Sequence, residues 1–73
     1  MDKIEAVKRV ICSVLNCELI ELSESTDITK IDGYDSLNHI KLIMELESQL
    51  SINIPIEDVE RLVFVKDYFK YLK

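Results

Sequence analysis

Residues 35–50 read DSLNHIKLIMELESQL, and this stretch decides the fold. At about 100° per residue, its apolar side chains recur with the spacing of a helix rather than the alternation of a strand. One cluster of them is wide enough to face a core: Leu42, Ile43, Leu46 and Leu50. Asp35 is a good N-cap, because its carboxylate can accept the free N–H groups of a first helical turn. We therefore predict a helix from Asp35 or Ser36 to about Leu50.

A second apolar stripe lies on nearly the opposite side of the same predicted helix. Its members are Leu37, Ile40 and Met44, flanked by Lys41, Glu47 and Ser48. A helix in a small bundle usually buries one stripe, so the second is surplus to folding. An exposed apolar strip that includes a methionine and is flanked by charged residues suits reversible binding of a partner protein. We favour a docking face, and the alternative is a central helix that buries both sides.

The residues before this helix predict one further helix and a long connection. Apolar residues at helical spacing indicate a first helix from about Asp2 to Asn16. The connection that follows, residues 18–34, is long for so small a domain, and loops of that length are usually functional or carry a short helical turn. Asp32-Gly33 is the turn signal that ends it. Some apolar residues of this loop can plug into the core: Leu19, Ile20, Leu22, Ile28 and Ile31.

The residues after this helix predict two shorter ones. Residues 52–55 form an extended link, and Pro55 can open a third helix that reaches about Arg61. The last helix spans about Val65 to Leu72, with Val65, Tyr68, Phe69 and Leu72 on its inner face. Residues 1–73 are therefore expected to form a single all-α domain. We expect a four-helix bundle with a short third helix and a long loop between the first two.

Composition narrows the class of function. Fourteen acidic and nine basic side chains give a formal charge of −5, so phosphate backbones would repel this surface and nucleic acid is a poor partner. A basic face on another protein is a better candidate partner, and the alternative is that the charge only keeps the protein soluble. A domain this small can hardly wrap a substrate pocket, which argues against an enzyme. We expect a monomer.

The remaining reactive residues indicate no metal site or crosslink. Cys12 and Cys17 lack the C-x-x-C spacing, and no secretory leader or membrane-spanning apolar run is present, so the cytoplasm is the expected compartment. Cys12, on the polar side of the first helix, is expected to be an exposed or half-covered thiol rather than a ligand, and Cys17 a small apolar filler. His39 falls on the core side of its helix, where an ordinary hydrogen bond is expected rather than a catalytic or metal role.

Asp35-Ser36-Leu37 lies where the loop meets the helix, which places Ser36 in the first turn. Its hydroxyl would be exposed at the positive end of the helix dipole, a favourable position for a phosphate group. From these three residues alone, ordinary capping explains the pattern equally well. The longer pattern is more specific. Residues 33–47 (GYDSLNHIKLIMELE), 52–58 (INIPIED) and 65–72 (VKDYFKYL) resemble the recognition helix, the following link and the closing helix of acyl carrier proteins.

This resemblance implies a prosthetic group and a set of partners. A phosphopantetheinyl transferase would use coenzyme A and magnesium to attach a 4'-phosphopantetheine arm to Ser36, recognising Asp35 and Leu37 beside it. The thiol of the arm would hold an acyl or aminoacyl group as a thioester, and separate enzymes would load and transfer it. The resemblance together with the second stripe assigns partner docking to Leu37, Ile40, Lys41, Met44, Glu45 and Glu47.

Some positions depart from the family pattern. Carriers of fatty acid synthesis usually have acidic residues where this chain has Asn38 and Lys41, so its docking face is less negative. The run from Ile31 to Tyr34 resembles that of stand-alone carriers in specialised pathways. Phe64 replaces the Thr that commonly caps the last helix, which predicts a weaker cap there. A specialised biosynthetic pathway is therefore expected, rather than housekeeping fatty acid synthesis.

Three other readings remain open at this point. The first is a peptidyl or aminoacyl carrier of the D-alanyl type, which would use the same serine and arm with a different loading enzyme. The second is a helical interaction module with no prosthetic group. The third is a calcium-binding loop built on Asp27, Asp32 and Asp35 around Gly33, but its ligand spacing fails.

Overall fold

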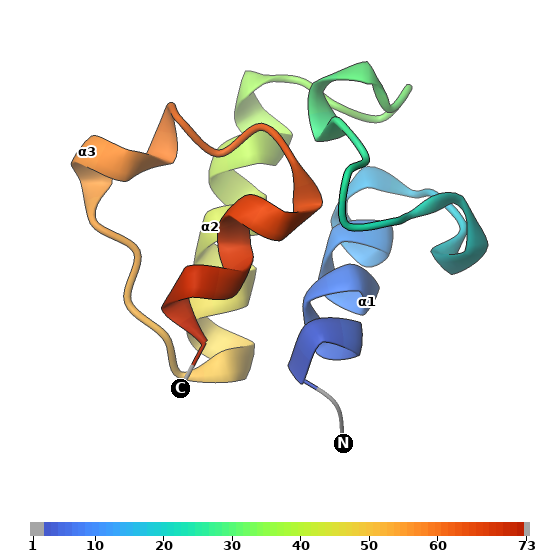
Figure 1. The fold of residues 1–73 in the computed structure, drawn as a ribbon. Helices are drawn as coiled ribbons and strands as arrows, with labels where there is room; N and C mark the ends of the chain where they lie inside the picture. Colours follow the sequence, from blue (N-terminus) through green and yellow to red (C-terminus); the bar gives the residue numbers. More distant parts are fainter. Residues whose placement is uncertain (1–2, 73) are drawn as a thin grey trace.

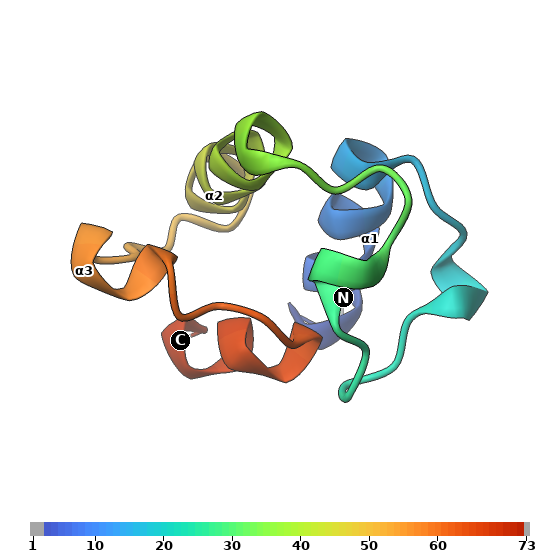
Figure 2. The same cartoon turned by 90° about the horizontal axis from the view of Figure 1, so that it is seen from above.

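A computed structural model describes residues 3–72 and contains only helical elements in that range. In chain order they are α1 (Lys3–Leu15), η1 (Leu19–Glu21), η2 (Ile28–Lys30), α2 (Ser36–Leu50), α3 (Ile56–Val59) and η3 (Val65–Tyr71), where η marks a 3-10 helix. Figures 1 and 2 show α1, α2 and η3 arranged around a common centre, with α3 on the outer side of α2. The predicted all-α fold is confirmed. Within residues 3–72, no helix combines the length and the apolar character that crossing a membrane requires.

The core draws on every part of the described chain. α1 contributes Val7, Val10, Ile11 and Leu15, and α2 contributes Leu42, Ile43 and Leu46, as their helical spacing predicts. The remaining buried apolar residues are Leu22, Ile28, Ile52, Ile54, Val59, Leu62, Val65 and Tyr68. Leu50, Phe69 and Leu72, predicted to face inward, pack against this core while remaining partly exposed.

Helix ends agree closely with the predictions. α2 begins at Ser36 after the N-cap Asp35. α1 ends at Leu15, one residue before the predicted end, and its predicted start at Asp2 lies outside the described residues. α3 stops at Val59 and is shorter than expected, and Pro55 serves as its N-cap. The last helix has 3-10 rather than α geometry, a form common in short segments.

The long loop contains two 3-10 turns and is fastened to the start of η3. The Ile28 N–H donates to the Val63 carbonyl at 2.8 Å, and the Val65 N–H donates to the Thr26 carbonyl at 3.0 Å. Leu22 and Ile28 are buried and plug the core as expected. Ile20 does not, because its side chain is 93% exposed in the η1 turn. The prediction of a core role for Ile20 is therefore wrong.

The start of η3 is held by a residue other than its N-cap. Phe64 has no side-chain acceptor, as its replacement of Thr predicts. The Asp67 carboxylate instead accepts hydrogen bonds from the Phe64 N–H at 2.9 Å and from the Val63 N–H at 3.0 Å. Two backbone donors that open this helix are thus satisfied from inside it, which offsets the missing cap.

Side-chain hydrogen bonds to α3 and to the link before it help to fix the position of α3. The Glu47 carboxylate accepts a hydrogen bond from the Ile54 N–H at 2.9 Å, which ties the extended link to α2. The Tyr71 hydroxyl donates to the Asp58 carboxylate at 2.9 Å, which ties α3 to η3. Burial and the neighbouring Asp58 raise the pKa of Tyr71 to about 12. α3 is too short to be stable alone, so these contacts hold it where it borders the functional site.

Both cysteines are free, half-buried thiols that pack against the core. Burial, together with the neighbouring Cys17, raises the pKa of Cys12 to about 12. Thiolates rather than thiols react, so Cys12 is a poor nucleophile at neutral pH.

The turn before α2 packs directly on the end of α1. A Cβ atom added to Gly33 would lie 2.8 Å from the carbonyl carbon of Leu15 and closer still to its oxygen. Both of these atoms belong to the backbone, so no side-chain rotation can relieve the contact. Glycine is required at residue 33 because two stretches of backbone approach each other closely there.

We expect Gly33→Ala to lower the free energy of unfolding by about 2–3 kcal/mol, because the added methyl group has to push the turn away from α1. Urea denaturation followed by circular dichroism measures this change. Asp32→Ala is the matched control, since it alters the exposed neighbour in the same turn. Equal stability of the Gly33→Ala variant and the wild type would show that the turn does not pack on α1 in this way.

Candidate functional site

Ser36 is the first residue of α2 and its side chain is exposed to solvent. Asp35, immediately before it, has extended backbone (φ −157°, ψ 176°), and its carboxylate accepts a hydrogen bond from the Asn38 N–H at 2.7 Å. Within residues 3–72 the Ser36 hydroxyl makes no hydrogen bond. Asp35 therefore performs the capping, and Ser36 is left with a free hydroxyl at the amino end of a 15-residue helix.

A second hydrogen bond locks the turn that presents Ser36. The side-chain amide of Asn38 donates to the Gly33 carbonyl at 2.7 Å, in a partly buried position. Asn38 thus holds the turn through its side chain while its backbone N–H binds the Asp35 cap. An acidic residue at this position, which the family pattern favours, could not donate that bond. The departure at Asn38 therefore has a structural reason.

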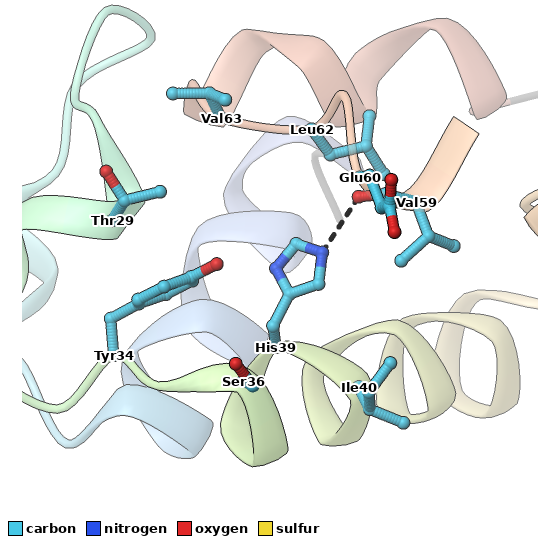
Figure 3. A pocket seen from close by; sticks show the side chains of 9 residues that line it. All are labelled: Thr29, Tyr34, Ser36, His39, Ile40, Val59, Glu60, Leu62 and Val63. Carbon is cyan, nitrogen blue, oxygen red and sulfur yellow. Dashed lines mark hydrogen bonds between the residues drawn. The ribbon is translucent and has the colours of Figure 1, made fainter. Parts of the chain in front are cut away.

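A cleft of about 300 Å³ opens beside Ser36, and we call it the Ser36 cleft. The end of the long loop, the first turns of α2 and the segment from α3 to η3 border it (Figure 3). The residues that line it are Thr29, Tyr34, Ser36, His39, Ile40, Val59, Glu60, Leu62 and Val63. The sequence alone predicted functional roles for Ser36 and Ile40. It could not predict the cleft, which forms only where the loop and α3 come close to α2 in the folded protein.

His39 forms the floor of the Ser36 cleft. Its side chain is 8% exposed, and its Nε2 atom lies 2.8 Å from the Val59 carbonyl oxygen. The Tyr34 ring packs edge-on against the imidazole, with 5.8 Å between ring centroids. The expected ordinary hydrogen bond of His39 is confirmed, and the residue is more deeply buried than the expected half-buried position.

The second apolar stripe of α2 is exposed, as predicted. Leu37 is 77%, Ile40 51% and Met44 64% exposed. Sequence reasoning missed Ile56 of α3, which is 85% exposed and lines a shallow groove shared with Ile40 and Met44. No periodic signal marks Ile56, because a four-residue helix has too few turns to define a face. We call Leu37, Ile40 and Met44 the exposed stripe.

The charged residues beside the exposed stripe differ in how free they are. Lys41 is exposed and has no ion-pair partner in the described part of the chain. Glu45 accepts a hydrogen bond from the Gln49 side-chain amide at 2.9 Å. Glu47 is half-buried, and one of its carboxylate oxygens is engaged by the Ile54 N–H. Glu47 therefore has a structural role in addition to any contact with a partner.

The acidic residues near Gly33 do not form a common site, because Asp27 and Asp35 cap two different helices. Asp27 accepts hydrogen bonds from the N–H and hydroxyl of Thr29 and caps η2, and the hydroxyl contact lowers the pKa of Asp27. Asp35 caps α2. No group of three or more His, Cys, Asp or Glu side chains is arranged to hold a metal ion within residues 3–72.

The arrangement around Ser36 fits a phosphate-linked arm. The hydroxyl is exposed and without a hydrogen bond in the described structure, so a bulky donor can reach it. The helix dipole of α2 favours negative charge at that end. The Ser36 cleft beside it is lined by both apolar and polar side chains, among them the buried His39 and the exposed Glu60, and it can accept a flexible chain that begins at the serine.

Comparison with known proteins agrees with this geometry. Residues 5–68 match the model of a protein family described as the phosphopantetheine attachment site. The chain is 36% identical over its full length to an acyl carrier protein of Helicobacter pylori strain J99, and it covers 94% of that protein. It is 34% identical over its full length to an acyl carrier protein of Helicobacter hepaticus, covering 96% of it.

The hydrogen bond from Asn38 to Gly33 predicts that Asn38→Asp lowers the free energy of unfolding by about 1–2 kcal/mol, because it replaces a partly buried donor with an acceptor facing a carbonyl. Chemical denaturation measures the loss. Asn53→Asp is the matched control, since it makes the same chemical change at an exposed position in the link. If the two variants are equally stable, the side chain of Asn38 does not hold the turn.

Proposed function

Because the chain belongs to the acyl carrier protein family, which carries the phosphopantetheine attachment site, we propose that Ser36 is the residue to which its 4'-phosphopantetheine arm is attached. The observation that carries the proposal is the free, exposed Ser36 hydroxyl directly after the N-cap of α2. The arm supplies a thiol that holds cargo as a thioester. The protein contributes the attachment point, its orientation and the surface that partner enzymes recognise.

The two neighbours of Ser36 have distinct roles in this proposal. Asp35 fixes the start of α2, so the transferase meets the serine in one orientation. Leu37 is the most exposed member of the exposed stripe and lies next to the attachment point, where the transferase has to approach. A phosphopantetheinyl transferase would form the phosphodiester by attack of the Ser36 oxygen on the pyrophosphate of coenzyme A. The serine hydroxyl loses its proton, the pyrophosphate bond breaks, and 3',5'-adenosine bisphosphate leaves.

The exposed stripe is the proposed surface for the enzymes that load and transfer the cargo. Leu37, Ile40 and Met44 supply apolar contact, while Lys41 and Glu45 supply one charge of each sign. Glu47 adds a carboxylate that is already tied to the link before α3. Chemistry on the cargo belongs to these partners, and we propose a monomeric carrier that acts in the cytoplasm.

The cargo is proposed to be an acyl group in a specialised biosynthetic pathway. The support is the mixed charge of the docking surface, with Asn38 and Lys41 where carriers of fatty acid synthesis usually have acidic residues. An aminoacyl cargo would use the same serine and arm, and only the loading enzyme would differ.

Attachment to Ser36 is tested by intact mass after incubation with coenzyme A, magnesium and a promiscuous phosphopantetheinyl transferase. The wild type should gain the mass of one arm, and Ser36→Ala should gain none while keeping its helical spectrum. Ser48→Ala is the matched control, because it removes an exposed serine from the same helix. An unmodified wild type with several transferases would contradict the proposal, as would continued loading of Ser36→Ala.

The docking role of the exposed stripe predicts that Met44→Glu weakens binding to a loading enzyme by at least about tenfold, the effect of losing roughly 1.4 kcal/mol. Its stability should change little, because Met44 is 64% exposed. Calorimetric titration and thermal melts measure the two quantities. Ser13→Glu is the control, since it adds the same charge at an exposed position on α1. A collapse of stability in Met44→Glu would place this residue in the core.

A further inference from the structure

His39 leaves one buried polar atom without a partner beside the attachment site. Two buried side-chain atoms in residues 3–72 lack a hydrogen bond: His39 Nδ1 and the Tyr68 hydroxyl. Tyr68 lies in the core, whereas His39 lines the Ser36 cleft. Figure 3 shows the imidazole between Val59 and Tyr34, with its free nitrogen on the side of the cleft occupied by Tyr34. A buried polar atom of this kind calls for an explanation, because such groups are almost always paired.

The hydrogen bond at the other ring nitrogen fixes what this atom can do. The Val59 carbonyl oxygen can only accept, so His39 Nε2 carries the proton of the 2.8 Å hydrogen bond between them. In the neutral imidazole the remaining nitrogen, Nδ1, is then an acceptor. Val59 belongs to α3, so the same contact that positions α3 also sets the tautomer. The Ser36 cleft thus presents an acceptor and requires a donor from whatever enters it.

We propose that His39 Nδ1 accepts a hydrogen bond from a hydroxyl or amide N–H group of the chain attached to Ser36. This inference rests on the proposed attachment site. Ser36 and His39 are three residues apart in α2, so their side chains are neighbours on one side of the helix, about 5–6 Å apart at Cβ. A chain leaving the Ser36 oxygen meets the imidazole first when it turns into the cleft. The bond anchors the chain along α2 and keeps it away from solvent.

Tyr34 controls access to this acceptor. Its ring covers the imidazole edge-on and is half-buried, at the end of the long loop. Its hydroxyl points toward His39 in Figure 3 but does not form a hydrogen bond with it. A chain that reaches Nδ1 therefore has to pass the edge of the Tyr34 ring or displace it. The Tyr34 hydroxyl itself is a competing partner for Nδ1.

The donor has two possible sources with the same chemistry. The phosphopantetheine arm carries a hydroxyl group and two amide N–H groups, and the hydroxyl and first amide lie close to its phosphate. A cargo with a hydroxyl group near the thioester carries a donor at the far end of the arm. The position of His39 one turn from Ser36 favours the arm.

The ¹⁵N resonance of His39 Nδ1 distinguishes these sources, because an unprotonated ring nitrogen moves to lower frequency when it accepts a hydrogen bond. Four forms of the ¹⁵N-labelled protein are compared: unmodified, carrying the arm alone, carrying a saturated acyl chain, and carrying the matching 3-hydroxyacyl chain. Each form is first verified by mass, so a failure to load Ser36 is recognised separately from an unchanged histidine. We expect the shift to appear as soon as the arm is attached.

A shift that appears only with the 3-hydroxyacyl chain also supports the proposal and assigns the donor to the cargo. An Nδ1 resonance that is the same in all four loaded and unloaded forms overturns it. Tyr34→Phe completes the comparison in the unmodified and arm-bearing forms. If the shift caused by the arm disappears in this variant, the Tyr34 hydroxyl rather than the arm supplies the donor, which counts against the proposal.

A second measurement follows the arm instead of the histidine. With ¹⁵N-labelled pantetheine attached, the heteronuclear NOE of the arm amides should fall toward the value of a free chain in His39→Phe, which has no acceptor. His39→Gln should restore it in part, since its amide can donate to Val59 and still offer an oxygen. Equal arm mobility in the wild type and both variants overturns the proposal.

Discussion

The close approach of Gly33 to the last carbonyl group of α1 sets the point at which the long loop ends and α2 begins. Asp35 and Asn38 then fasten the turn from the helix side, one through its carboxylate and the other through its amide. The Ser36 hydroxyl makes no hydrogen bond within residues 3–72 and takes no part in fastening the turn. Its orientation is therefore imposed entirely by its neighbours, which leaves the hydroxyl available for modification without loss of structure.

Three sides of the α2 helix have different surroundings and different roles. One side packs into the core through Leu42 and Leu46, and the exposed stripe faces solvent. Between them, His39 and Ser36 border the cleft that α3 closes. Exposing large apolar side chains forfeits roughly 25 cal/mol for each Å² that folding would otherwise bury. α2 tolerates this loss of folding free energy because its opposite side is well packed. A partner that docked on the exposed stripe would bury the same side chains and regain part of that free energy.

The sequence predicted best what depends on local spacing. The bounds of α2, its Asp35 cap, the exposed stripe and the exposed Ser36 follow from periodicity and capping rules, and the structure confirms them. Prediction from the sequence failed for features that depend on tertiary contacts. The isolated antiparallel β-bridge between Asp27 and Phe64 is one of them, because no local sequence pattern indicates it. The exposure of Ile20 is equally hidden, because an apolar residue in a loop can be assigned to the core only once the loop path is known.

Charge at the docking surface shows why composition alone misleads. By formal charge alone, the docking surface is only slightly acidic, because it contains Asn38, Lys41, Glu45 and Glu47. The structure assigns Asn38 to the turn and one oxygen of Glu47 to the link before α3. Lys41 remains as an exposed charge without an ion-pair partner in the described residues, and the half-buried Glu45, which accepts a hydrogen bond from Gln49, has the opposite sign. Charge at the edge of an interface mainly steers encounter, whereas buried apolar contact sets affinity. We therefore expect partners of this carrier to depend on the shape of the exposed stripe more than on its charge.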